Sequence, residues 1–89
     1  MYFTVETSAA KTGRENLIYR LTSSKKFVEG VGTARVYGVS CSFRSRPETE
    51  VTVEDVSADE AETKRVIFRL ATLGVTPSGI FDEINGMLG

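Results

Sequence analysis

A chain of 89 residues can form one folded domain around a single core, and it is too short for two. Hydrophobic residues make up 40% and charged residues 26%, which is ordinary for a globular protein and argues against a disordered chain, and no apolar run approaches the length of about 20 residues that spans a membrane. The net charge is −1, and with one cysteine and no histidine the sequence excludes an internal disulfide and lacks the commonest general base and metal ligand.

The first two thirds of the chain are predicted to form strands. Residues 2–7 and 16–22 alternate apolar and polar side chains, and the short connector between them allows only an antiparallel hairpin. Residues 23–33 are the least regular part and contain two glycines, so we expect a flexible hairpin loop there, with short extensions of the flanking strands as an alternative. Residues 34–44 and 50–56 alternate again, which predicts a third, central strand and a fourth.

The alternation divides the predicted sheet into an apolar and a polar face. The apolar face holds Phe3, Val5, Leu17, Tyr19, Leu21, Tyr37, Val39, Cys41, Phe43, Val51 and Val53. The opposite face is expected to be solvated, and it holds Thr4, Glu6, Arg20, Thr22, Ser40, Ser42, Arg44, Thr52 and Glu54. The third strand carries small residues on this polar face, with Gly38 among them. They allow the face either to lie open to water or to be approached closely by another backbone segment.

A first amphipathic helix is predicted over residues 58–73. Ser57 and Glu60 have the spacing of a capping box, in which each side chain satisfies a backbone amide of the other residue. Acidic residues follow in the first turn, where the helix dipole favours negative charge, and Gly74 is suited to the left-handed conformation that ends a helix.

A second helix is predicted over residues 77–88, with Thr76 as its cap and Pro77 at its first position. Its apolar stripe consists of Ile80, Phe81, Ile84, Met87 and Leu88. The predicted fold is therefore a single α+β domain, residues 1–89, in which a four-stranded antiparallel meander carries two C-terminal helices on one face.

Four short segments of the sequence resemble a family of short uncharacterised proteins from anaerobic, spore-forming Gram-positive bacteria. They are residues 17–21, residues 36–39, residues 53–57, and Thr76 and Pro77 with Ile80, Asp82 and Ile84. The resemblance implies a bacterial cytoplasmic protein with this order of strands and helices, and it transfers no catalytic or binding residue. The N-terminal residues also lack the basic segment and apolar run of a signal peptide, so we expect a cytoplasmic location.

Several chemical motifs are incomplete in this chain. Gly30 and Gly32 would begin a dinucleotide-binding loop only with a third glycine where Arg35 stands, and Lys11-Thr12 lacks the glycine of a phosphate-binding loop. The acidic residues between positions 48 and 62 fit no calcium-binding loop. The second helix carries two acids and no base, which disfavours a place in a DNA groove. We therefore expect no cofactor and no metal.

The residues most able to act as nucleophiles are predicted to be structural. Cys41 lies among apolar neighbours on the inner face of the third strand, so we expect a buried small hydrophobic side chain with no histidine to activate it. Tyr19 and Tyr37 are expected to be core residues whose hydroxyls reach the rim. We therefore expect no catalytic residue and no enzyme.

Charge is distributed unevenly along the chain. Residues 1–46 carry a net charge of +5 and residues 47–89 a net charge of −6. This asymmetry is typical of a solvated surface with ion pairs, and it also suits a basic surface for an acidic partner. The candidate basic surface consists of Arg20, Lys25, Lys26, Arg35, Arg44 and Arg46.

These observations favour a small non-enzymatic protein-interaction or regulatory module. We expect the partner to be another protein, or a second copy bound through a sheet edge or the last helix, and we expect no membrane partner. One alternative is single-stranded nucleic acid on the basic surface, although the aromatic residues that would stack on bases are expected to point inward. The other is a histidine-free enzyme, which would require a deep pocket where tyrosine, arginine and glutamate side chains converge.

Overall fold

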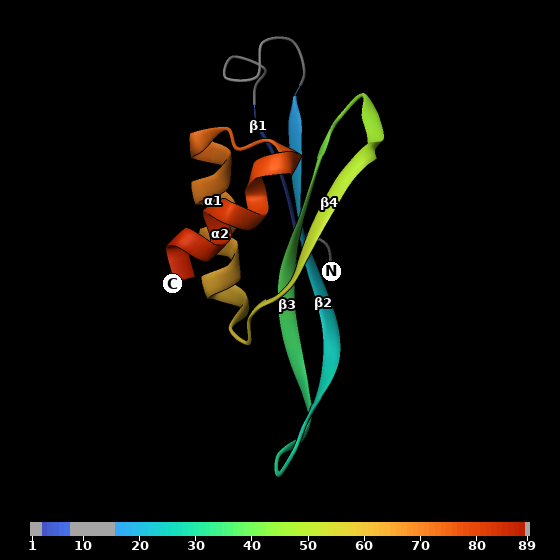
Figure 1. Cartoon of the computed structure of the whole chain (residues 1–89), viewed down its shortest axis with the longest axis vertical. Coiled ribbons are helices and arrows are strands. Elements are labelled where there is room, and N and C mark those ends of the chain that lie inside the picture. Colours follow the sequence, from blue (N-terminus) through green and yellow to red (C-terminus); the bar gives the residue numbers. More distant parts are fainter. Residues whose placement is uncertain (1–2, 8–15, 89) are drawn as a thin grey trace.

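The computed structural model describes residues 3–7 and 16–88, and it shows an α+β fold with one open sheet and two C-terminal helices (Figure 1). The strands are β1 (Thr4–Thr7), β2 (Leu17–Val28), β3 (Gly32–Phe43) and β4 (Arg46–Ser57). All neighbouring pairs are antiparallel in the order β1-β2-β3-β4, which confirms the predicted meander. The first two residues, the connector at 8–15 with Lys11-Thr12, and the side chain of Leu88 lie outside the described part.

Two helices follow the sheet and lie on one side of it (Figure 1). They are α1 (Glu60–Leu73) and α2 (Ile80–Leu88), and the short 3₁₀ helix η2 (Pro77–Gly79) leads into α2. Pro77 stands at the first 3₁₀ position, as the sequence predicts, but Thr76 makes no side-chain capping bond. Within the described residues, neither helix is long and apolar enough to cross a membrane.

The core lies between the helices and the predicted apolar face. Its buried members are Leu17, Tyr19, Val39, Cys41, Val56, Val66, Ile67, Leu70, Ile80 and Ile84. Two residues expected to be buried are exposed, and Tyr37 is half-buried and lies outside the core cluster. Val51 is exposed because β4 is an edge strand, so one of its sides has no neighbouring strand. Phe81 is 57% exposed because it lies next to Ile80, about 100° around the helix from the buried stripe.

The hairpin predicted at residues 23–33 is confirmed, but the flexible loop is wrong, because the flanking strands extend through most of this segment. The register between β2 and β3 continues without a break from Leu17↔Phe43 to Val28↔Gly32. The hairpin closes through a bond from the Val31 amide to the Val28 carbonyl, 3.0 Å long, and Gly30 and Gly32 take positive φ angles of 82° and 101°. The alternation of hydrophobicity fails here because neither side of the ribbon is buried, so its residues carry no signature of a half-buried strand.

The structure decides how the small residues of β3 are used. A register shift between Tyr37 and Val39 lets β4 bulge toward β3, and Asp55 within the bulge has a φ of 57°. A Cβ atom at Gly38 would lie 2.5 Å from the Val53 carbonyl oxygen and 3.1 Å from the Glu54 Cα atom. Of the two alternatives left open by the sequence, the close approach of another backbone applies at Gly38.

Helix α1 begins two residues later than the capping box predicts, at Glu60, and its cap is Asp59 rather than Ser57. The Asp59 carboxylate accepts hydrogen bonds from the amides of Ala61 at 2.9 Å and Glu62 at 3.4 Å. The Ser57 hydroxyl accepts instead from the Asp59 amide, at 3.0 Å. The predicted C-terminus is confirmed, because Gly74 is left-handed with a φ of 69° and its amide bonds back to the carbonyls of Leu70 and Ala71.

This assignment of the cap is testable by substitution. Asp59→Ala is expected to lower the free energy of unfolding by about 1 kcal/mol, because two amides of the first turn lose their acceptor. Ser57→Ala should lower the free energy of unfolding by less, because only the Asp59 amide, which precedes the helix, loses its acceptor. Urea denaturation of both variants measures the difference, and a larger loss for Ser57→Ala would contradict the assignment.

Candidate functional site

The most distinctive surface is the outer half of the β2–β3 hairpin, residues 22–36, here called the arm. Strand β1 pairs with β2 only as far as Arg20, with one further bond to Leu21, and β4 pairs with β3 only as far as Tyr37. Among residues 3–7 and 16–88, no third strand pairs with β2 or β3 beyond these points, and the two strands project from the rest of the molecule (Figure 1). The whole molecule, with the arm included, extends 48 Å along its longest axis and 24 Å and 19 Å along the others. Isolated two-stranded ribbons are only marginally stable in water, so this projection needs an explanation.

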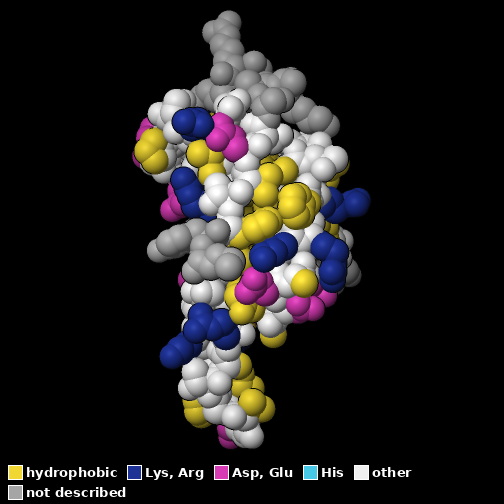
Figure 2. Space-filling view, turned by 180° about the vertical axis from the view of Figure 1, so that it is seen from behind, with side chains coloured by type: hydrophobic (Ala, Val, Ile, Leu, Met, Phe, Trp, Pro, Cys, Tyr) yellow, Lys and Arg dark blue, Asp and Glu magenta, His cyan; other side chains and the backbone are white. Residues whose placement is uncertain are grey.

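The end of the arm exposes apolar side chains. Phe27 is 75% exposed, Val31 is 76% exposed, and Val28 lies beside them at the turn. We call these three residues the tip. Figure 2 shows hydrophobic side chains at the end of the arm and Lys and Arg side chains closer to the body. Exposed apolar groups that cluster on a projection, rather than being scattered singly, are typical of an interaction site.

Two cations face each other directly behind the tip. Lys25 and Arg35 are cross-strand partners in the hairpin, and both are exposed. Like charges directly opposite each other destabilise a pair of strands. Arg35 donates to the Ser23 hydroxyl at 3.1 Å, and neither cation forms an ion pair with a carboxylate of the described residues. The arm carries a single acid, Glu29 in the turn, so its net charge is +2.

The six residues of the candidate basic surface do not form one surface. Lys25 and Arg35 lie together, whereas Lys26 projects from the other side of the arm and is paired with Asp55 in the β4 bulge. The Arg44 guanidinium contacts both oxygens of Glu6, at 2.9 Å and 3.0 Å. Hydrogen bonds from Asn16 and Arg44 lower the pKa of Glu6 below its usual range. Three of these charges are therefore used within the chain, counting the ion pair of Arg20 with Glu50.

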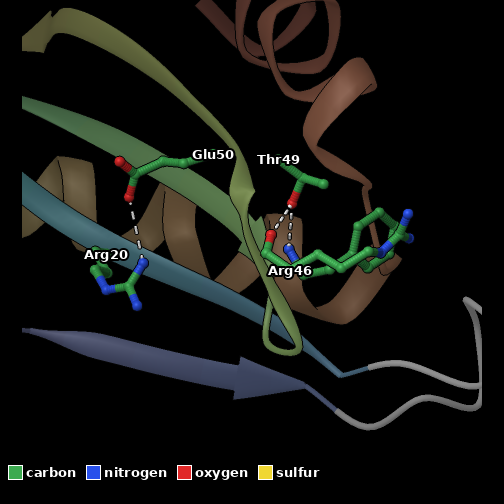
Figure 3. A network of polar contacts seen from close by, with 5 residues as sticks. Arg20, Arg46, Thr49 and Glu50 are labelled. Carbon is green, nitrogen blue, oxygen red and sulfur yellow. Dashed lines mark hydrogen bonds and ion pairs between the residues drawn. The ribbon is translucent and has the colours of Figure 1, made fainter.

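Arg20 and Arg46 organise the sheet rather than a site (Figure 3). Arg20 on β2 reaches Glu50 on β4 at 3.3 Å, and in doing so it spans the central strand β3. This bridge accounts for the burial of Ser40 and Ser42, at 3% and 2% exposure, on a face expected to be solvated. Arg46 lies over the Phe43 ring at 4.6 Å, and its carbonyl accepts from the Thr49 hydroxyl at 2.6 Å.

The two groups considered as nucleophiles are built into the core. The Tyr19 hydroxyl donates to the carbonyls of Val75 at 2.6 Å and Leu70 at 3.3 Å, which ties β2 to the end of α1. The Cys41 thiol contacts the same Val75 carbonyl at 3.8 Å. Burial raises the pKa of the Cys41 thiol to about 12 and also raises the pKa of Tyr19. Neither group is available as an anion near neutral pH.

The thiol chemistry of Cys41 gives a direct check. Because the side chain is fully buried and its pKa is raised to about 12, the thiol should react with a disulfide reagent at pH 8 only as fast as the protein opens. Absorbance of the released thiolate in native buffer and in denaturant measures this. Equally rapid labelling in both would contradict the burial of Cys41.

Two hollows mark the surface of the described residues. The smaller, about 230 Å³, lies where the arm leaves the body and is lined by Arg35, Tyr37 and Glu60. Its residue types are those required of a histidine-free enzyme, but its volume is below the range of about 300–1,000 Å³ usual for ligand pockets. The larger, about 790 Å³, is an open groove between α1 and α2, here called the helix groove.

Sequence reasoning missed the tip and the helix groove. The sequence places Phe27 and Val31 in a predicted flexible loop. Gly30 and Gly32, which lie between two segments of equal length, are the signal that indicates a hairpin there. The charges of the groove repeat on α1 at Glu62, Arg65 and Arg69, a helical spacing that places them on one side.

The fold and its projecting arm define a class of small open-sheet α+β proteins with an exposed apolar hairpin. The chain belongs to the family described as "Family of unknown function (DUF6514)", which it matches over residues 1–88. No curated protein and no solved structure matches the chain. The expected resemblance to a family of uncharacterised proteins is thus confirmed at the level of a family of unknown function.

Proposed function

We propose that this protein is a non-enzymatic protein-binding module of the bacterial cytoplasm, and that it binds its partner through the arm. The observation that carries the proposal is the pair of opposed, exposed cations, Lys25 and Arg35, immediately behind the exposed Phe27. This arrangement costs stability in the free chain, and sites that break local rules in this way are often functional. The bacterial cytoplasm follows only from the resemblance noted in the sequence.

Contact with an acidic partner would remove two unfavourable features of the arm, the exposure of Phe27 to water and the repulsion between Lys25 and Arg35. Burial of a Phe27-sized side chain contributes about 1.5–3 kcal/mol, and neutralisation of Lys25 and Arg35 removes their mutual repulsion. A partner strand could also pair with the outer edge of β2 beyond Leu21, because β2 has β3 on one side there and no strand on the other within the described residues. The absence of an enzymatic role is supported by the engagement of Tyr19 and Cys41 in core hydrogen bonds.

The proposal is tested by affinity capture from a lysate of the source cells with three folded baits. They are the unchanged protein, Phe27→Ser, and the matched control Phe81→Ser, which removes an exposed phenylalanine from α2 instead of the arm. We expect a stoichiometric protein partner that the first and third baits retain and the Phe27→Ser bait loses. Retention by all three baits, or loss only with Phe81→Ser, would contradict binding through the arm.

One observation favours single-stranded nucleic acid as a second candidate. Contrary to the expectation that all aromatic residues point inward, Phe27 is exposed beside cations, which is how base-stacking surfaces are built. Fluorescence polarisation of a labelled oligouridine at low and high salt tests this candidate. Salt-sensitive binding that Phe27→Ser abolishes would replace the protein partner with RNA, and no polarisation change at low salt would remove the candidate.

A further inference from the structure

The helix groove combines apolar surface with charged side chains of both signs. Val66 and Met87 contribute the apolar surface, Glu62, Arg65 and Arg69 lie on the α1 side, and Asp82 and Glu83 lie on the α2 side. These five charged side chains are exposed, and none of them forms an ion pair within the described residues. The groove therefore offers unpaired charges of both signs around apolar surface.

The arm carries the complementary set of groups. Its tip presents Phe27 and Val31 for the apolar surface, and Glu29 lies between them in the turn. Lys25 and Arg35 stand two residues behind Phe27 and opposite each other, at roughly 7 Å by the rise of a strand. Glu29 suits the arginines of the α1 side, while the paired cations suit Asp82 and Glu83 of the α2 side.

We propose that the tip of the arm of one copy binds in the helix groove of a second copy of this chain. This inference rests on the proposed function, since it takes the arm as the binding surface. The arm extends from the sheet away from both helices, so it does not reach the groove of its own chain (Figure 1). The groove of this chain offers apolar, acidic and basic groups together, and each has a counterpart on the arm. An unrelated acidic protein would supply only the acidic groups, so the second copy is the better partner.

The contact joins two different surfaces, which limits the assemblies that it can form. Two copies that each place an arm in the groove of the other form a closed dimer, whereas non-reciprocal contacts form an open chain. In both assemblies Phe27 is buried at the centre of the contact. Truncation of a central aromatic residue commonly weakens an interface at least tenfold.

Sedimentation velocity over a wide range of protein concentration tests the inference. We expect the unchanged protein to associate with rising concentration, and we expect Phe27→Ser to raise the dissociation constant at least tenfold. Replacing both Asp82→Lys and Glu83→Lys should weaken association similarly, because the groove then repels Lys25 and Arg35. Phe81→Ser is the matched control and should leave association unchanged, since Phe81 is not part of the groove lining.

Mixing the two weakened variants supplies a stronger criterion. The Phe27→Ser chain retains an intact groove, and the Asp82→Lys, Glu83→Lys chain retains an intact arm, so one fully intact contact can form between the unlike chains and should make them pair with each other. Far-UV circular dichroism confirms that each variant is folded. A monomer at every concentration, or association that Phe27→Ser or the pair Asp82→Lys, Glu83→Lys does not weaken, would overturn the inference.

These results separate the inference from the proposed function. A monomeric protein that still loses its captured partner with Phe27→Ser refutes the second copy and leaves the arm as the binding surface. A monomeric protein whose captured partners are unaffected by Phe27→Ser refutes both. Oligouridine binding by the monomer would assign the arm to nucleic acid instead.

Discussion

Gly38→Ala is expected to lower the free energy of unfolding by about 1–3 kcal/mol, because the added methyl group overpacks the sheet. The new Cβ atom would lie 2.5 Å from the Val53 carbonyl oxygen and 2.7 Å from the Thr22 hydroxyl oxygen. The first of these atoms belongs to the backbone of the β4 bulge, so the bulge itself would have to move. The cost therefore includes lost pairing between β3 and β4 as well as the steric contact.

Gly86→Ala provides a control with the same chemical change. Gly86 lies in α2, and a Cβ atom there would meet nothing within 4 Å. Alanine in a helix interior is more favourable than glycine by about 0.5–1 kcal/mol, so this variant should be slightly more stable than the unchanged protein. Urea denaturation of both variants would give shifts of opposite sign. A stable Gly38→Ala protein would contradict the close approach of β4 at this position.

Ile67→Ala is expected to have the largest effect of any single substitution considered, a loss of about 2–5 kcal/mol. Ile67 is fully buried at the centre of α1, where it packs in the cluster that joins both helices to the sheet. Its truncation removes apolar contacts and leaves a cavity that neighbouring side chains fill only in part. Since small domains are stable by only about 5–15 kcal/mol, a substantial unfolded fraction at elevated temperature is expected.

Leu73→Ala on the same helix is the matched control. Leu73 is 45% exposed at the last position of α1, so its truncation should cost less than about 1 kcal/mol. Thermal and urea denaturation followed by circular dichroism would rank the two variants. Equal decreases in the free energy of unfolding for Ile67→Ala and Leu73→Ala would mean that α1 does not pack on the sheet through the face that contains Ile67.

Much of the fold could be predicted because one side of each element is buried. Leu17 and Tyr19 on β2, Val39 and Cys41 on β3, and the stripe on α1 all follow the periodicity of their elements, and all of these strand residues lie in the core. The positive φ of Gly74 likewise follows from a local requirement that glycine meets best. Such features depend on neighbours in the chain or on one buried face.

The candidate site could be predicted only in part. The sequence indicates a basic first half, but it does not show that Arg20, Lys26 and Arg44 are paired with acids from other strands. It also does not distinguish the exposed arm from a loop, since a ribbon without a buried face lacks alternation. Of the six candidate residues, only Lys25 and Arg35 remain opposite each other beside an exposed aromatic side chain.

The sequence by itself determined the class of fold and most of the inner face, and it favoured the meander as the simplest topology, because hydrophobic periodicity and turn chemistry are local and act along the chain. Only the tertiary structure decided the length of the arm, the cap at Asp59, the bulge over Gly38 and the pairing of the charges. Each of these depends on which residues distant in the sequence meet across strands, since register and bulges arise from packing of the whole sheet. Within residues 3–7 and 16–88, neither β1 nor β4 pairs along the arm, and the extent of a neighbouring strand is not encoded within the arm itself.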